Sequence, residues 1–176
     1  KSRIFKITSD NVVLKNIRFV GGKYGDIKGG VIYNTGKNLK ISSCKFTDCR
    51  CGDYNGVIYN KGDNFKLVSC KFSGCSARMD WSGVIYNNAK NMKMSYCKFS
   101  KCSNDGSEAF TSGVVCNKGN YLKIIHCTFT NSKNPIYNNG KNLKISHCKF
   151  SKSRHILNFG KNCKIASCSF SKCYTT

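Results

Sequence analysis

Apolar and polar residues alternate along this chain in short pieces, and the pieces recur. In residues 30–46, Leu39 and Ile41 flank one lysine. Cys44 and Phe46 flank the next lysine. Alternation with a period of two is typical of a β-strand that buries one face. Two serines separate the pieces, so we expect the chain to turn a corner between strands of about three residues.

The same stretch returns throughout the chain. Full copies start at Gly56, Gly83 and Gly113, shorter copies start at Pro135 and His155, and a degraded copy runs from Ile4 to Phe19. Within a copy, the asparagine of I-Y-N and the phenylalanine of C-x-F are always 12 residues apart, whereas the step to the next asparagine varies from 8 to 18 residues. Length changes confined to one place per repeat map to loops on one face of a solenoid.

The repeat excludes two common solenoids. A helical repeat needs long apolar runs with a period of 3.6, and a leucine-rich repeat needs L-x-x-L-x-L, and the chain has neither. The sequence therefore predicts an all-β fold: a single-stranded parallel β-helix of about seven coils, forming one domain over residues 1–176. At ~4.8 Å per coil the stack is about 30 Å long.

Stacking places equivalent residues of successive coils above one another, and five apolar columns are predicted to fill the core. The columns are Ile17, Cys44, Cys70, Cys97, Cys127, Cys148, Cys168; Phe19, Phe46, Phe72, Phe99, Phe129, Phe150, Phe170; Phe5, Ile32, Ile58, Ile85, Val115, Ile136, Ile156; Leu39, Phe65, Met92, Leu122, Leu143, Cys163; and Ile41, Leu67, Met94, Ile124, Ile145, Ile165. We expect Asn34, Gly36 and Asn38 at tight corners, because both residue types tolerate positive φ.

The charge predicts an anionic partner. Thirty Lys+Arg against eight Asp+Glu give a formal net charge of +22, which attracts polyanions. Two outward lysine rows are predicted: Lys40, Lys66, Lys93, Lys123, Lys144 and Lys164, and Lys45, Lys71, Lys98 and Lys149. Arginine is scarce, so an anionic polysaccharide or cell-wall polymer is a better partner than nucleic acid. The alternative is a solvated basic surface without a partner.

The cysteines follow the repeat. The spacing C-x4-C occurs at Cys44/Cys49, Cys70/Cys75, Cys97/Cys102 and Cys168/Cys173. These residues form either two stacks of buried thiols, which behave as small apolar side chains, or disulfide bonds that secure the loops. The chain has thirteen cysteines, and because this number is odd, at least one cannot pair within the chain. Cys51 and Cys116 fall outside the pattern and are candidates for a stray or intermolecular bond.

No cofactor or metal site is predicted. The chain lacks the C-x-x-C spacing of zinc and iron–sulfur sites. His126 and His147 share one corner position in adjacent coils. We interpret them as stacked surface residues in preference to a metal site with Cys127 or Cys148.

The variable loops combine carboxylates with aromatic residues, which is typical of sugar recognition. The candidate ligand-binding residues are Tyr24, Asp26, Asp53, Tyr54, Asp80, Trp81, Asp105, Glu108 and Phe110. A nearby outward or corner row is formed by Tyr33, Tyr59, Tyr86 and Tyr137. Two carboxylates about 5–9 Å apart could cleave a glycosidic bond. The alternative is a set of polar loops with a few packing aromatics, and we assign no catalytic residue.

Two families resemble this repeat. Gly29-Gly30-Val31-Ile32, followed by Phe-x-x-Cys, resembles the G-G-A-I and F-x-x-N repeats of polymorphic outer-membrane proteins. The consensus I-Y-N-x-G-x-N-L-x-I-x-x-C-x-F is more similar to the right-handed β-helix repeats of archaeal adhesin-like surface proteins. The resemblance covers nearly the whole chain and implies a right-handed coil, surface display and adhesion. The chain departs from the outer-membrane pattern in its basic charge and in having cysteine, at Cys49 for example, where that repeat has asparagine.

These observations favour a non-enzymatic extracellular or cell-surface β-helix with an adhesive or structural role. The alternatives are a module that binds anionic polysaccharide, and a polysaccharide lyase or hydrolase that uses the loop carboxylates. No apolar run is long enough for a membrane span. The repeats reach close to both ends of the given sequence without a recognisable cap, so we expect a homo-oligomer or an end-to-end filament.

Overall fold

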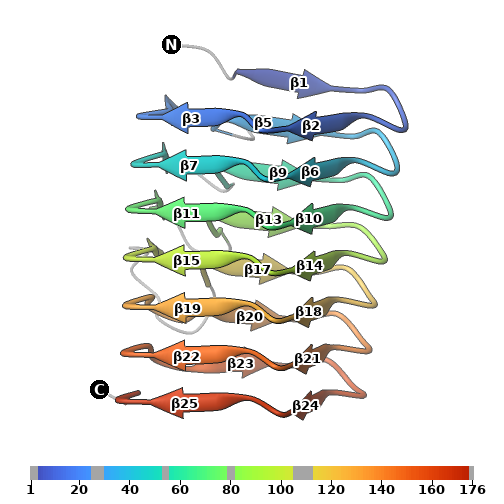
Figure 1. The fold of residues 1–176 in the computed structure, drawn as a ribbon. Coiled ribbons are helices and arrows are strands. Elements are labelled where there is room, and N and C mark those ends of the chain that lie inside the picture. The colour runs from blue at the N-terminus through green and yellow to red at the C-terminus, as the bar shows by residue number, and fades with distance from the viewer. Residues whose placement is uncertain (1–3, 25–29, 53–55, 79–81, 105–112, 175–176) are drawn as a thin grey trace.

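The computed structural model describes residues 4–24, 30–52, 56–78, 82–104 and 113–174, which form short strands wound into stacked coils (Figure 1). Each coil contributes one strand to each of three seven-stranded sheets. The first four coils add a strand to a fourth, shorter sheet. Paired strands are parallel throughout, as in β5 with β9. The predicted parallel β-helix of seven coils is therefore confirmed.

The four sheets are numbered in the order in which a coil visits them. Sheet 1 comprises β1 (Phe5–Ile7), β5 (Ile32–Asn34), β9 (Ile58–Asn60), β13 (Ile85–Asn87), β17 (Val115–Asn117), β20 (Ile136–Asn138) and β23 (Ile156–Asn158). Sheet 2 comprises β2 (Val13–Lys15), β6 (Lys40–Ser42), β10 (Lys66–Val68), β14 (Lys93–Ser95), β18 (Lys123–Ile125), β21 (Lys144–Ser146) and β24 (Lys164–Ala166).

The remaining strands follow the second corner. Sheet 3 comprises β3 (Arg18–Val20), β7 (Lys45–Thr47), β11 (Lys71–Ser73), β15 (Lys98–Ser100), β19 (Thr128–Thr130), β22 (Lys149–Ser151) and β25 (Ser169–Ser171). Sheet 4 comprises β4 (Lys23–Tyr24), β8 (Arg50–Cys51), β12 (Ser76–Ala77) and β16 (Ser103–Asn104).

The core consists of the predicted apolar columns. In sheet 2, for example, Leu67 pairs with Ile41 on one side and Met94 on the other, and all three are buried. The phenylalanine column is a continuous ring stack from Phe19 to Phe170, with centroids 4.5 to 5.2 Å apart. Each buried ring contributes about 1.5–3 kcal/mol of transfer free energy. The columns hold the coils in register.

The core prediction was wrong for the last described coil. Phe170 and Ile165 are 55% and 43% exposed, and Cys163 is exposed as well. These residues have a coil above them but none below them within the described residues. At the other end, the Phe5 ring packs edge-on against Phe19, with centroids 6.0 Å apart and planes at 80°.

Three corners turn each coil, and each uses one residue with a left-handed backbone. Asn38, Ser43 and Asp48 occupy these positions in the second coil, with φ of 59°, 53° and 50°. The corner expected at the paired serines and the role of Asn38 are confirmed. Gly36 has another role than the one expected: its φ is not positive, and a Cβ there would collide with the carbonyl oxygen of Ser9 in the preceding coil. Glycine is therefore required for close backbone approach.

Asn34 was predicted at a corner, and this prediction was wrong. It lies in β5 and is fully buried, as are its counterparts in the next coils. Its side-chain nitrogen donates to the Gly36 carbonyl oxygen and to the side-chain oxygen of Asn60, each at 2.7 Å. The second bond repeats from coil to coil through Asn60, Asn87, Asn117, Asn138 and Asn158. This asparagine ladder pairs polar groups that would be costly to bury alone.

The tyrosine row was predicted on an outer or corner position, but it is largely covered. Tyr59, Tyr86 and Tyr137 are 3 to 7% exposed and form a second apolar cluster beside sheet 1. The rings of Tyr59 and Tyr86 stack with centroids 4.9 Å apart. Cys116 takes the tyrosine position in β17. Burial raises the pKa of its thiol to about 12.

Candidate functional site

Sheet 2 carries a straight row of lysines on its outer face. The strand register pairs Lys66 with Lys40 and Lys93, and the same pairing continues through the remaining members. The row consists of Lys40, Lys66, Lys93, Lys123, Lys144 and Lys164. All are exposed except Lys123, which is half-buried. Neighbouring strands are about 4.8 Å apart, so the row repeats a positive charge at that interval.

Sheet 3 carries a second basic row, which begins one coil earlier than expected. Arg18 of β3 pairs with Lys45, so it heads the row of Lys45, Lys71 and Lys98. Thr128 interrupts the row in β19 before Lys149 continues it. The sequence places Arg18 next to Phe19, just as each lysine of this row precedes its phenylalanine. This pattern could have identified Arg18 as the first member of the row.

A third group of lysines lies at the corner that follows sheet 3, and sequence reasoning missed it. Lys101, Lys152 and Lys172 occupy the left-handed position of this corner, with φ of 50° to 52°. Each comes two residues after the phenylalanine of its coil, which is the signal that could have found it. Together with the two rows, these corner lysines form the basic face.

Few acidic residues offset this charge in the part of the chain that the structure describes. Those acids are Asp10, Asp48 and Asp63. Asp10 accepts a hydrogen bond from the Lys37 backbone nitrogen at 2.8 Å, and Asp63 accepts one from the Lys90 backbone nitrogen at 2.9 Å. Their carboxylates therefore tie successive coils together at the first corner.

Three rings stack along the corner between sheets 2 and 3. Tyr96 and His126 lie 5.0 Å apart with planes at 12°, and His126 lies 4.9 Å from His147. All three side chains are exposed. The two histidines are thus neighbours on the surface, as expected, and Tyr96 extends their stack. Among the described residues, no group of three or more His, Cys, Asp or Glu is arranged to hold a metal.

The loop site stays a prediction. Asp26, Asp53, Tyr54, Asp80, Trp81, Asp105, Glu108 and Phe110 lie outside the described residues. Tyr24 lies in β4, and only its backbone is described.

Ten of the thirteen cysteines form two separate columns of reduced thiols, and Cys51, Cys116 and Cys163 lie outside them. The first, from Cys44 to Cys168, lies at the corner between sheets 2 and 3, and the second, from Cys49 to Cys173, lies beyond sheet 3. All thirteen cysteines lie in the described residues, and none forms a disulfide there. Each thiol of the two columns approaches the carbonyl oxygen two residues earlier, as Cys44 does with Ser42 at 3.3 Å. Burial raises the pKa of the Cys44 thiol.

Two serines show why thiols suit the second column. In the coils with the shortest loops, Ser132 and Ser153 replace cysteine and are fully buried. Their hydroxyls donate to the same type of carbonyl oxygen, at 3.2 and 3.1 Å. A serine hydroxyl can therefore replace the thiol and keep the same carbonyl partner. The position requires a small hydrogen-bond donor and does not require a disulfide.

Comparison with known proteins agrees with this architecture. A family model described as the right-handed beta helix region matches residues 4–137. The chain belongs to the right-handed β-helix family. Coil handedness, which the resemblance implied, follows from this membership. No curated protein matches this right-handed β-helix.

Among solved structures, the full-length fluoroquinolone resistance protein QnrB1 is similar at 11% identity, with a TM-score of 0.34, over 93% of this chain and 86% of that one. A trypsin-treated variant of QnrB1 is similar at 12% identity, with a TM-score of 0.22, over 96% of this chain and 84% of that one. In the described residues of the right-handed β-helix, no helix is long and apolar enough to span a membrane.

Proposed function

We propose that this right-handed β-helix is a non-enzymatic module of an extracellular or cell-surface protein, and that its basic face attaches to a linear anionic polysaccharide. The strand register carries the proposal. It aligns six lysines on sheet 2 in one straight row and sets the Arg18-to-Lys149 row beside it on sheet 3. A polymer with regularly spaced carboxylates or sulfates can contact several coils at once.

The energetics of the rows favour a bound polymer. Like charges directly opposite in neighbouring strands destabilise a sheet by a few tenths of a kcal/mol or more per pair. Lysine stems splay and relieve part of this repulsion. An aligned polyanion would neutralise the rest, and displacement of its counterions would add to the binding free energy. The affinity should therefore fall steeply as salt increases.

Polysaccharide is favoured over nucleic acid for two reasons. The chain has five arginines in its 30 Lys+Arg, so few side chains can make the bidentate contacts that identify bases. The exposed rings of Tyr96 and His126 stack, and His147 lies against His126 with its plane tilted by 35°, so the faces of the middle ring are already occupied. Single-stranded nucleic acids bind to free aromatic faces.

Catalysis lacks support in the part of the chain that is described. Asp10 and Asp63 hold backbone nitrogens of neighbouring coils, which is a structural role. The carboxylates of the predicted loop site, which a lyase or hydrolase would need, lie outside the described residues. A binding and attachment role therefore fits the described geometry better than a glycosidic cleavage.

A binding titration with matched variants tests the proposal. Polygalacturonate and heparin should bind, whereas neutral dextran should not, and the apparent affinity should fall with added salt. The double variant K66Q/K93Q removes two adjacent charges of the sheet 2 row. The control K6Q/K61Q removes the same charge near sheet 1, where Lys6 pairs with Tyr33. We expect the first variant to lose about tenfold in affinity and the control less than about threefold.

Three results would contradict the proposal. Equal losses in both double variants would mean that only the net charge matters. Binding of dextran as tight as that of heparin would remove the electrostatic basis. Tighter binding of single-stranded DNA than of either polysaccharide, at matched charge and salt, would favour the nucleic-acid alternative.

The homo-oligomer or end-to-end filament expected from the repeat stays a prediction. Light scattering should show mass that grows with concentration. A wild type that stays monomeric at high concentration would contradict association.

A further inference from the structure

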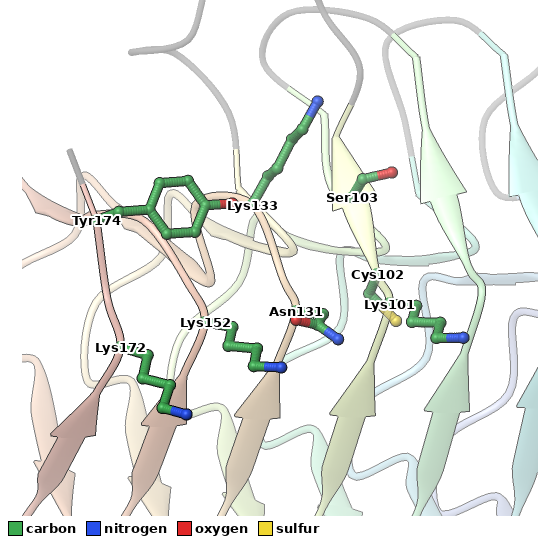
Figure 2. Close-up of a pocket in the computed structure, with 8 residues that line it drawn as sticks. All are labelled: Lys101, Cys102, Ser103, Asn131, Lys133, Lys152, Lys172 and Tyr174. Carbon is green, nitrogen blue, oxygen red and sulfur yellow. The ribbon is translucent and has the colours of Figure 1, made fainter. Parts of the chain in front are cut away.

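The corner lysines border a hollow of about 460 Å³ on the C-terminal half of the molecule, which we call the basic hollow (Figure 2). Its lining residues are Lys101, Cys102, Ser103, Asn131, Lys133, Lys152, Lys172 and Tyr174. Figure 2 shows Lys172, Lys152 and Lys101 along one line, with Asn131 between Lys152 and Lys101, and the Lys133 side chain points away from that line. Ligand sites for small molecules commonly measure about 300–1,000 Å³.

The lysines of the hollow occupy a corner that suits smaller residues. The fold requires a left-handed backbone there, and Gly21, Asp48, Gly74 and Asn131 fill this position in other coils. Glycine, asparagine and aspartate adopt that conformation at the lowest cost, whereas other residues cost about 1–2 kcal/mol. Lys101, Lys152 and Lys172 adopt it in the three remaining coils. Tyr96, His126 and His147 adopt the same conformation at the preceding corner, so the charge of the third corner is what distinguishes it.

The hollow also contains neutral hydrogen-bonding groups. Ser103 and Asn131 contribute a hydroxyl and an amide, and Tyr174 contributes a phenol. The guanidinium of Arg154 lies 5.8 Å from the centroid of the Tyr174 ring, which places a fifth cation behind the lining. The Arg154 Nε is buried and has no hydrogen-bond partner among the described residues. The lining of the hollow therefore combines four lysines with neutral donors that can contact oxygen atoms.

We propose that the basic hollow binds a compact multivalent oxyanion: a small molecule or sugar that carries several phosphate or sulfate groups. Lysine acts as a mobile point charge, so four ammonium groups around one hollow suit a cluster of tetrahedral anions better than a single planar carboxylate. A single phosphate would neutralise only part of the four charges. The hollow lies at the third corner of the basic face, whereas the polymer proposal is tested on the sheet 2 row, so either proposal can fail without the other.

Calorimetry with defined probes tests the site at about 150 mM salt, near physiological ionic strength. Inorganic tripolyphosphate and a trisulfated disaccharide are the two multivalent probes, and inorganic sulfate is the comparison that carries one anionic group. The variant K152N/K172N removes two corner charges and places asparagine where Asn131 already adopts this backbone, so it should fold. The matched control K141Q/K161Q removes two exposed charges from the same coils, at the turn that precedes sheet 2.

We expect saturable one-to-one binding of at least one multivalent probe and weak binding of sulfate. K152N/K172N should weaken the better probe about tenfold, and the control should weaken it less than about threefold. Preference between the two probes identifies whether phosphate or sulfate is the natural group. Y174F, which removes only a hydroxyl, should weaken binding about two- to threefold. Equal losses in both double variants, or no saturable binding of either probe, would overturn the proposal.

Discussion

The side-chain nitrogen of Asn60 lies 2.7 Å from the side-chain oxygen of Asn87, one coil further along the stack. Both residues are buried in consecutive strands of sheet 1. The bond makes the coils interdependent, because each amide satisfies a polar group in its neighbour that water cannot reach.

Replacing Asn87 with alanine should therefore destabilise the fold strongly. The change removes the bonds from Asn60 and to Asn117, and it leaves the Ala89 carbonyl oxygen without its side-chain donor. Each buried group left unpaired costs about 1–3 kcal/mol, so we expect a loss of about 2–4 kcal/mol in the free energy of unfolding. Urea denaturation followed by circular dichroism measures it.

Asn91 provides the control for that experiment. It belongs to a second asparagine ladder at the exposed corner, where its nitrogen lies 3.1 Å from Asn64 Oδ1. Because its φ is 60°, the matched change is N91G, which keeps the backbone relaxed. We expect a loss below about 1 kcal/mol. A loss equal to that of N87A would contradict a special role for the buried ladder.

The state of the cysteines can be measured by mass. Since all thirteen thiols are free in the described structure, alkylation of the unfolded chain should add thirteen groups without prior reduction. Under native conditions, reaction should concentrate on Cys163 and Cys173, which are exposed, because the first column and Cys116 are largely enclosed. Fewer than thirteen additions before reduction, rising after it, would show that disulfides form.

Burial of the Cys116 thiol predicts that the fold loses stability in alkali. Its thiol has a pKa of about 12 in the folded protein because burial disfavours the thiolate, against an ordinary value of 9.0. Between these values the unfolded chain releases a proton that the folded chain keeps, so stability is complete below a pH of about 9 and falls as pH rises toward about 12. The slope for one such thiol is about 1.4 kcal/mol per pH unit. C116V should be measurably less sensitive over this range, and identical pH profiles would contradict the assignment.

The lysine rows predict that removing one lysine charge from the sheet 2 row increases the stability of the fold. Lys93 lies between Lys66 and Lys123 in the register. K93Q removes the repulsion of Lys93 with each of these two lysines. It should raise the free energy of unfolding by about 0.2–1 kcal/mol at low salt, and the gain should vanish near about 1 M salt. K61Q is the control, since Thr35 and Asn88 precede and follow Lys61 in its column. A salt-independent gain in K93Q would point to a different cause.

The sequence predicts the coil, the core columns and the lysine rows because the repeat has a fixed spacing from asparagine to phenylalanine. Stacking then determines which side chains are neighbours. Leu67 and its partners illustrate this, since their register follows from alignment alone.

Other features depend on information that the repeat does not carry. Asparagine suits both corners and buried amide ladders, so residue type alone could not place Asn34. The tyrosine row lies on the outer side of sheet 1, and its burial depends on what covers that sheet. Lys101, Lys152 and Lys172 alternate in their column with glycine, asparagine and aspartate, so no lysine repeat was evident. The loop acids lie in segments whose lengths differ from coil to coil.

The buried asparagine ladder also has an electrical direction. Backbone hydrogen bonds between coils point both ways, as Lys66 N donates to the preceding coil and Ile58 N to the following one, so their dipoles largely cancel. The buried amides from Asn34 to Asn138 all donate toward the C-terminal coil. The exposed ladder at the first corner donates toward the N-terminal coil, but water screens it. Inside the molecule, the aligned dipoles of the buried ladder therefore add along the axis, as in a helix, with the positive end toward the C-terminal coils.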